Sequence, residues 1–408
     1  MRFPLLLVFV LLIGLGCTRK EPEPVVKSHV DPGPAIAPQP VPPDDGSIPP
    51  PRLVPVRSRM QALTLGVDYL LAQQSKDGAW RSDVYATFKD GTALTPLAVT
   101  ALQEAHDAGI RTPAIEVAIK NGCAFLANFT KPDGTITPPT DGFDYPIYTA
   151  SLTLKAFMHP TAKDYAKYRD AWVKYIKERQ LTEKLGWKPE EKQYGGWGYC
   201  RVIPKKPEPG EFAPPLIESN LSATLFALEA LKAAGETDAE VYKKAAEFVL
   251  RCQNDDGGFH FIYDDPVRNK AGVANTEPQR FHSYGSTSAD GFRALGFCLL
   301  PEHEKRAAAA TEWLKKNFRA DHHPGTYVKA HEPNRDAVYY YYAASVAKAF
   351  RDHKLTLPNG RDWAAELSYE LAIRQAKDGS WTNPVELVRE NEPLVASSNA
   401  ILALARCR

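Results

Sequence analysis

Three heptapeptides decide the fold of this chain: QSKDGAW at Gln74–Trp80, QNDDGGF at Gln253–Phe259 and QAKDGSW at Gln375–Trp381. In each, a Gln is followed after three residues by Gly, and after one more by an aromatic residue. Looser copies fill the intervals, with Glu191, Gly195 and Trp197 in EKQYGGW, Gly134 before Ile136, and Gly325 before Tyr327. The six units recur every 55 to 70 residues or so, a period typical of folds built from stacked repeats.

A helical pattern of apolar residues precedes each glycine turn, and a more apolar pattern follows it. The first set carries charged faces and covers Met60–Gln73, Ala114–Phe129, Tyr165–Arg179, Ala239–Cys252, Glu304–Phe318 and Trp363–Arg374. The second set is apolar on nearly every side, as expected of enclosed helices, and covers Thr92–Ala108, Tyr148–Met158, Ser219–Ala234, Ser286–Leu300, Ala337–Phe350 and Leu394–Ala405. Alternating inner and outer helices predict an all-α, (α/α)6 double-walled toroid over residues 57–408.

The repeated segment is assigned to the scaffold of this toroid. Gly permits a positive φ in the turn, the aromatic ring can pack on the next unit, and the Gln amide can bond free backbone groups at a helix end. The scaffold residues are Gln74, Trp80, Trp197, Gln253, Phe259, Gln375 and Trp381.

The Gln, Gly and Trp spacing is similar to the QW motif of squalene and hopene cyclases. The six-unit arrangement resembles their alpha/alpha toroid, which protein prenyltransferase beta subunits share. The resemblance covers roughly Arg57 to Arg408. It implies a pocket at one end of the barrel, formed in part by the segments that lead into the inner helices.

The first 17 residues, MRFPLLLVFVLLIGLGC, combine one Arg with an apolar run and have the layout of an export signal. The segment resembles a bacterial lipoprotein signal, in which Cys17 carries the lipid anchor. An ordinary cleaved signal and an uncleaved anchor remain alternatives. Residues 18–56 are rich in Pro and are expected to form an extended, disordered tether. We therefore expect an exported lipoprotein on the periplasmic or cell-surface side, with the membrane as a partner.

The net charge of +1 gives no electrostatic reason to expect nucleic acid as a partner. Beyond Cys17, the cysteines are odd in number and lack the spacing of metal ligands, so we expect mostly buried thiols, with one disulfide as the alternative. Neither a metal nor a cofactor is predicted. The five residues are Cys123, Cys200, Cys252, Cys298 and Cys407.

Polar residues gather where the chain leads into the inner helices, which is where the resemblance places the pocket. The candidate cavity residues are Asp144, Tyr148, Glu218, Asn220, Ser286, Asp336, Tyr339 and Tyr340. Ser, Asp and Asn at such positions also cap helices by accepting backbone N–H bonds, and capping is the alternative role for each. Of the four tyrosines at 339–342, one or two are expected to face the lumen, because successive helix residues point about 100° apart.

The segment HSYGSTSADGFRAL provides the weak catalytic candidates His282, Tyr284 and Asp290. His282 is a potential general base, and Asp290 is an acid one turn into the fourth inner helix. Arg293, three residues further along, can neutralise Asp290 in a structural ion pair instead.

The known chemistries of the fold leave no motif in this chain. The DxDD acid of alkene-protonating cyclases, the DDxxD motif of diphosphate ionisation, the zinc ligands of prenyltransferases and a thioester motif are all missing. The leading interpretation is a membrane-tethered toroid that binds a hydrophobic, isoprenoid-like ligand, with enzymatic activity undecided. A noncatalytic protein-interaction module and a polysaccharide lyase or hydrolase are the alternatives.

Overall fold

The computed structural model describes residues 57–276, 279–298 and 301–408. The predicted export signal, the tether and Cys17 lie outside these ranges. Within them, no helix combines the length and the apolar character needed to cross a membrane.

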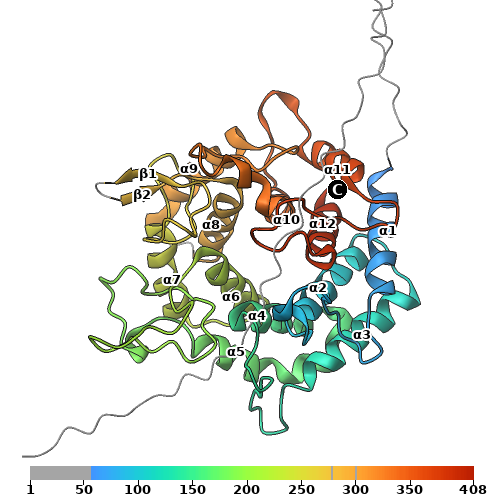
Figure 1. Ribbon diagram of the computed structural model, residues 1–408, viewed down its shortest axis with the longest axis horizontal. Helices are drawn as coiled ribbons and strands as arrows, with labels where there is room; N and C mark the ends of the chain where they lie inside the picture. Colours follow the sequence, from blue (N-terminus) through green and yellow to red (C-terminus); the bar gives the residue numbers. More distant parts are fainter. Residues whose placement is uncertain (1–56, 277–278, 299–300) are drawn as a thin grey trace, which may run out of the picture. The chain divides into compact units, whose positions relative to one another are not determined.

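Six helices form a closed inner ring (Figure 1). Each contacts the next along the series, and the last contacts the first. They are α2 (Leu94–Asp107), α4 (Pro146–Met158), α6 (Leu221–Ala233), α8 (Gly285–Phe297), α10 (Tyr339–Asp352) and α12 (Pro393–Arg406).

Six further helices alternate with these along the chain and pack on the outside of the ring (Figure 1). They are α1 (Arg59–Ala72), α3 (Pro113–Ala127), α5 (Arg169–Lys177), α7 (Ala239–Arg251), α9 (Glu304–Asn317) and α11 (Trp363–Arg374). The double-walled toroid is therefore confirmed. Helix α5 is shorter than predicted, because Pro160–Tyr168 forms 3-10 turns with a non-helical Ala162.

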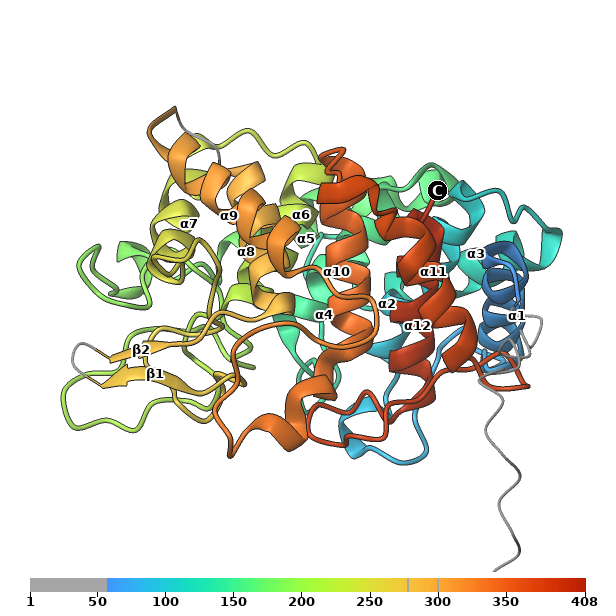
Figure 2. The ribbon, with the colours of Figure 1, turned by 90° about the horizontal axis from the view of Figure 1, so that it is seen from above.

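Other elements are short. An antiparallel hairpin, β1 (Val273–Thr276) and β2 (Gln279–Phe281), was not predicted. The remaining 3-10 turns are Ala86–Phe88, Glu183–Leu185, Pro301–His303, Glu332–Val338 and Pro358–Gly360. Figure 2 shows that the long connections leading into the inner helices, including the hairpin, gather at one end of the ring.

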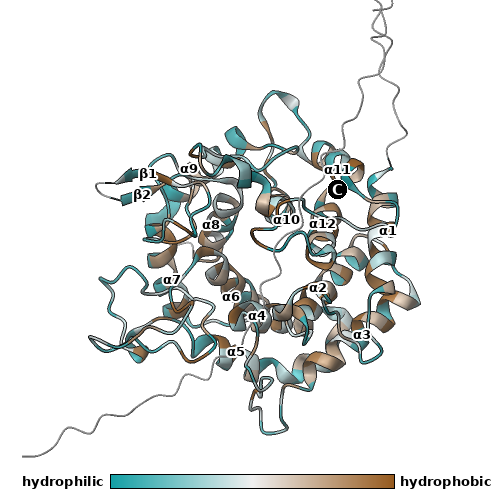
Figure 3. Ribbon diagram, in the orientation of Figure 1, coloured by the Kyte–Doolittle hydropathy of each residue, from teal (hydrophilic) through white to brown (hydrophobic). Residues whose placement is uncertain are grey.

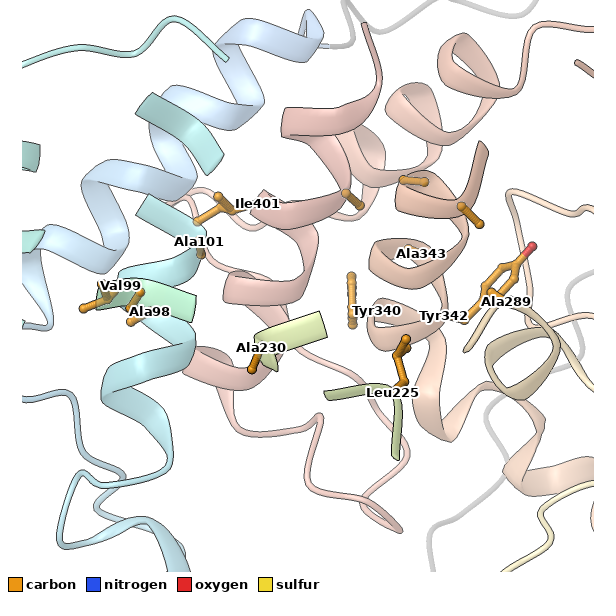
Figure 4. Close-up of a cluster of buried hydrophobic side chains, with 14 of the residues drawn as sticks. Ala98, Val99, Ala101, Leu225, Ala230, Ala289, Tyr340, Tyr342, Ala343 and Ile401 are labelled. Atoms are coloured by element: carbon orange, nitrogen blue, oxygen red, sulfur yellow. The ribbon is translucent and has the colours of Figure 1, made fainter. Parts of the chain in front are cut away.

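The inner helices are enclosed, as their composition predicted. Every residue of α8 from Gly285 to Leu295 is buried, whereas α7 buries only one side. Hydrophilic residues concentrate in the loops (Figure 3). Small side chains such as Ala98, Ala230 and Ala343 are buried within the walls (Figure 4), where their size permits close approach of the helices.

In four of the six units, a Gln of the repeated segment joins one outer helix to the next. Gln74 Nε2 donates to the carbonyl oxygens of Gly78 and, on α3, Ala118, both at 2.9 Å. Gln253 makes the same pair of bonds, to Gly257 and to Arg306 on α9. Gln375 Nε2 bonds Gly379 and, at 2.9 Å, Ala62 of α1, and so closes the outer wall.

In three of the six repeats, the indole of a Trp returns to the helix that precedes the turn. The Nε1 atoms of Trp80, Trp197 and Trp381 donate to carbonyl oxygens at 2.7, 2.8 and 2.8 Å. All three rings are fully buried. The indole groups bond the turn to the end of the outer helix that precedes it, while the Gln amide bonds the turn to the next outer helix.

The third unit corrects one assignment. Gln180, and not Glu191, makes the two bonds, to the carbonyl oxygens of Gly195 and Val241, both at 2.9 Å. Glu191 instead pairs with Lys206. The residues between Gln180 and Gly195 form an inserted loop with its own small apolar cluster, so the ordinary spacing of the motif is lost in the sequence.

Candidate ligand-binding lumen

A cavity of about 390 Å³ opens inside the inner ring, at the end where the chain leads into the inner helices. All six inner helices contribute side chains to this mouth chamber. Its wall is dominated by eight aromatic residues: Phe88, Tyr145, Tyr148, Tyr199, Phe226, Phe261, Tyr284 and Tyr341. Aromatic walls with a few placed polar groups are typical of small-molecule sites.

Local backbone geometry places several of these rings. Tyr145 adopts a left-handed conformation, with φ 49°, immediately before Pro146 starts α4. Its ring meets that of Tyr199 edge-on at 5.5 Å between centroids. Tyr148 meets Phe226 edge-on at 4.9 Å, and Phe226 lies 6.2 Å from Tyr341. The rings thus support one another around the chamber.

Asp290 is the acid of the chamber. Its side chain accepts hydrogen bonds from Tyr341 Oη at 2.7 Å and from Ser345 Oγ, and Arg293 lies 3.8 Å away. Burial raises the pKa of Asp290 to about 6, against the opposing effects of Arg293, Ser345 and Tyr341. A carboxyl with such a pKa can exchange a proton near neutral pH.

Glu390 is a second buried carboxyl in the chamber lining. It accepts the backbone N–H groups of Tyr340 and Tyr341 at 3.0 and 2.7 Å, and an Asn383 amide N–H at 3.0 Å. Burial raises the pKa of Glu390 to about 7, although these donors oppose the shift. The carboxyl caps the first turn of α10 from a separate loop, where the helix dipole favours a negative charge.

Lys270 brings an amine to the same chamber. Its Nζ lies 5.0 Å from the centroid of the Phe261 ring, and none of the described residues forms a hydrogen bond with it. Burial lowers the pKa of Lys270 to about 8, and Glu390 partly offsets that effect.

Four predicted residues line the mouth chamber: Tyr148, Tyr284, Ser286 and Asp290. The hydroxyl of Tyr284 is buried without a partner among the described residues. Asp144 is close by, but it pairs with Arg201 in a separate side pocket of about 310 Å³.

The other predicted cavity residues have structural roles outside the chamber lining. Asn220 caps α6 by accepting the N–H of Ala223, and Glu218 pairs with Arg268. Asp336 accepts the N–H of His323 at 2.7 Å. His282, proposed as a base, is also absent from the chamber lining.

The tyrosine run faces the lumen through a different member from those predicted. Tyr339 and Tyr340 donate to the carbonyl oxygens of Ala320 and Thr382, away from the chamber, while Tyr341 lines it. The sequence contained a pattern that indicates which tyrosine faces the lumen. Tyr341, Ser345 and Lys348 are spaced as i, i+4 and i+7 and mark one polar stripe along the helix before its charged last turn.

The described residues contain no group of three or more His, Cys, Asp or Glu side chains that could hold a metal ion. In the same part of the chain, Cys123, Cys200, Cys252, Cys298 and Cys407 are buried free thiols.

Comparison with solved structures identifies other toroids of this shape. A variant of type II terpene cyclase MstE from Scytonema, in complex with geranylgeranyl dihydroxybenzoate, aligns with TM-score 0.54 and 11% identity over 86% of this chain and 97% of that one. Unsaturated glucuronyl hydrolase from Bacillus sp. GL1 aligns with TM-score 0.53 and 16% identity over 85% and 96%. An unsaturated glucuronyl hydrolase specific for heparin gives TM-score 0.56 and 14% identity over 85% and 96%. No family model matches the sequence. At these identities the likeness establishes the alpha/alpha toroid fold.

Proposed function

We propose that this toroid binds a hydrophobic, isoprenoid-like molecule in the mouth chamber. The observation that carries the proposal is the aromatic lining of a hollow lumen of about 390 Å³. That volume lies within the range of about 300 to 1,000 Å³ common to small-molecule pockets. Burial of an apolar chain against these rings releases water from both surfaces and favours binding.

Exposed apolar side chains in the connections that lead into the inner helices are a second feature, and one of them, Leu387, lines the chamber. Val84, Val202, Phe212, Val267 and Leu387 all lie in the connections that lead into inner helices, and Phe212 is fully exposed. Exposed apolar residues at the edge of a pocket are compatible with an apolar ligand, and Leu387 has this position.

Binding without cyclisation is consistent with the chemistry of Asp290. Protonation of an isolated alkene requires an unusually strong acid, whereas burial makes Asp290 a weaker acid than a free carboxyl by raising its pKa to about 6. The geranylgeranyl compound in the MstE complex indicates that a toroid of this shape can hold such a chain.

The test begins with the protein purified from its native membrane. Lipid extraction and mass spectrometry should yield one isoprenoid per protein. Titration of geranylgeraniol should give a Kd that Phe226→Ala weakens about tenfold, a loss of about 1.4 kcal/mol. Tyr369→Ala, which truncates an exposed aromatic residue on α11, serves as the control. Repeated extraction of no isoprenoid, together with equal affinity in all three proteins, contradicts the proposal.

We also propose that the protein is exported and anchored through lipid on Cys17. The support is the sequence of residues 1–17. Mass spectrometry of the mature N-terminal peptide should show a diacylated Cys17, and Cys17→Ala should shift the protein from the membrane to the soluble fraction. An unmodified Cys17 in a membrane-bound protein favours the uncleaved anchor.

Hydrolysis or elimination at a sugar is a second candidate function. It is favoured by two chamber carboxyls with raised pKa values, Asp290 and Glu390, because acid–base chemistry on glycosides uses such pairs. Release of product from unsaturated glucuronyl disaccharides, abolished by Asp290→Asn, would support it. The interaction module has less support, because the lumen is hollow.

A further inference from the structure

Each inner helix contributes one charged side chain to a second, narrower part of the lumen. The six residues form a charged belt: Glu104, Lys155, Glu229, Arg293, Lys348 and Arg406. The belt lines a cavity of about 70 Å³. Tyr148, Phe226, Tyr341 and Asn399 border both this narrow chamber and the mouth chamber.

Glu229 is the centre of the ion pairs in the belt. Lys155 and Lys348 approach its carboxylate at 3.3 and 3.0 Å, and Arg293 donates a hydrogen bond to it. Although burial opposes the effect, these three cations hold the pKa of Glu229 well below its usual range. One carboxylate therefore faces three cations.

The other two members of the belt add one charge of each sign, so the excess of positive charge comes from the cations around Glu229. Glu104 pairs with Arg406, which also reaches Asp352 at 2.8 Å at the exposed end of α10. On the side of the mouth chamber, Asp290 lies 3.8 Å from Arg293. Among the side chains that line the narrow chamber, four are cations and only two are carboxylates.

The order of the charges around the ring shows where the excess of cations over carboxylates lies. The consecutive inner helices α8, α10 and α12 supply Arg293, Lys348 and Arg406, with no acid between them in the belt. A belt built only for ion pairing would alternate in sign, because buried like charges repel and uncompensated charges are costly. Burial lowers the pKa of Lys348 to about 8, and Arg293 Nε is buried without a partner among the described residues.

We propose that the charged belt is a binding site for a compact oxyanion, a phosphate or a carboxylate, held by Lys155, Arg293, Lys348 and Arg406. Guanidinium and ammonium groups bind such anions through charge-assisted hydrogen bonds, and Arg can do so with two parallel bonds. The narrow chamber has room for a small polar group but not for a chain. For comparison with this cavity of about 70 Å³, one water molecule takes up about 30 Å³ in the liquid.

The anion has two possible sources with the same chemistry. It is either a free ion or the head of an amphiphile whose apolar chain occupies the mouth chamber, and only the second source rests on the proposed function. The shared border of Tyr148, Phe226, Tyr341 and Asn399 places the two chambers next to each other. A head group in the belt and a chain among the aromatic rings would use both.

Calorimetric titration of the folded protein with inorganic phosphate tests the site directly. Phosphate should bind at pH 7, and Lys348→Met should weaken the Kd at least about tenfold. This variant removes an excess cation, so it should remain folded. Lys232→Met is the matched control, because Lys232 is exposed on α6, the helix that carries Glu229. Absence of phosphate binding to the wild-type protein overturns the proposal, as does equal binding by both variants.

Glu229→Gln separates a ligand site from a structural ion network. Removal of this internal anion should tighten phosphate binding several-fold if the cations are available to a ligand. A network without a ligand role predicts lower stability and no gain in affinity. Binding should also weaken as the pH rises through about 8, where Lys348 loses its proton.

Dodecyl phosphate identifies the source of the anion. Much tighter binding than that of inorganic phosphate indicates a lipid head group, and equal binding indicates a free ion; both results support the site. Geranylgeraniol lacks an anionic head and tests the mouth chamber alone. Failure of geranylgeraniol binding with retained phosphate binding would therefore contradict only the proposed function. Failure of phosphate binding with retained geranylgeraniol binding would contradict only the oxyanion site.

Discussion

The wall and the lumen of this toroid repeat in different ways. Four joints of the outer wall use the same residue for the same two hydrogen bonds, through Gln74, Gln180, Gln253 and Gln375. In the lumen only the position is repeated: each inner helix contributes one charged side chain to the narrow chamber, and neighbouring helices differ in the residue that they supply. The joint must satisfy one backbone geometry, so its chemistry is fixed, while lumen residues are free to fit a ligand.

The largest expected effect is on the wall. Trp381→Ala should lower the free energy of unfolding by about 3 to 5 kcal/mol, because a fully buried ring and its bond to Leu371 are lost. Chemical denaturation measures the loss. Geranylgeraniol affinity, measured where the variant is folded, should be unchanged. A weaker affinity at an unchanged melting temperature would contradict the assignment of Trp381 to the scaffold.

Substitution of Asp290 in the lumen should instead change how the free energy of unfolding depends on pH. Burial raises the pKa of Asp290 from 3.8 to about 6. The folded state therefore keeps a proton that the unfolded chain releases, and stability from this group falls as pH rises from about 4 to 6. Between pH 4 and 7 the wild-type protein should lose about 2 kcal/mol relative to Asp290→Asn. Chemical denaturation of both proteins at each pH measures the difference. Parallel profiles of unfolding free energy against pH would contradict a raised pKa for Asp290.

Gln375→Ala tests the closure of the outer wall and should have a smaller effect on stability than Trp381→Ala. The change leaves the carbonyl oxygens of Ala62 and Gly379 without the amide, at a cost of about 1 to 3 kcal/mol. Thermal unfolding should show the loss, whereas Gln73→Ala, at an exposed position, should be neutral. Loss of ligand affinity with no fall in melting temperature would argue against a scaffold role.

The smallest effect is expected at a turn without the Gln joint. Gly134 has φ +81°, but a Cβ there would meet nothing within 4 Å. Gly134→Ala should cost only the backbone preference, about 1 kcal/mol. A Cβ at Gly195 would instead lie 1.9 Å from the carbonyl oxygen of Lys244. Equal losses of stability for Gly134→Ala and Gly195→Ala would show that the two kinds of turn do not differ.

The sequence predicted most of the fold and part of the site. Helix positions could be inferred because apolar periodicity and glycine turns are local properties. Four chamber residues, Tyr148, Tyr284, Ser286 and Asp290, were identified, while Asn220 illustrates how a helix cap resembles a site residue in sequence. Glu390 was harder to assign, because its role depends on contact with α10 from a distant loop.

The sequence by itself determined the alternation of enclosed and exposed helices, and hence the toroid, because burial leaves a periodic record in one chain. Tertiary structure alone decided which tyrosine of the run at 339–342 faces inward and that Gln180 replaces Glu191 at the third joint. It also brought six charges from six helices into the lining of one narrow chamber. Such neighbours are far apart in the chain, so only the closure of the ring makes their charges interact.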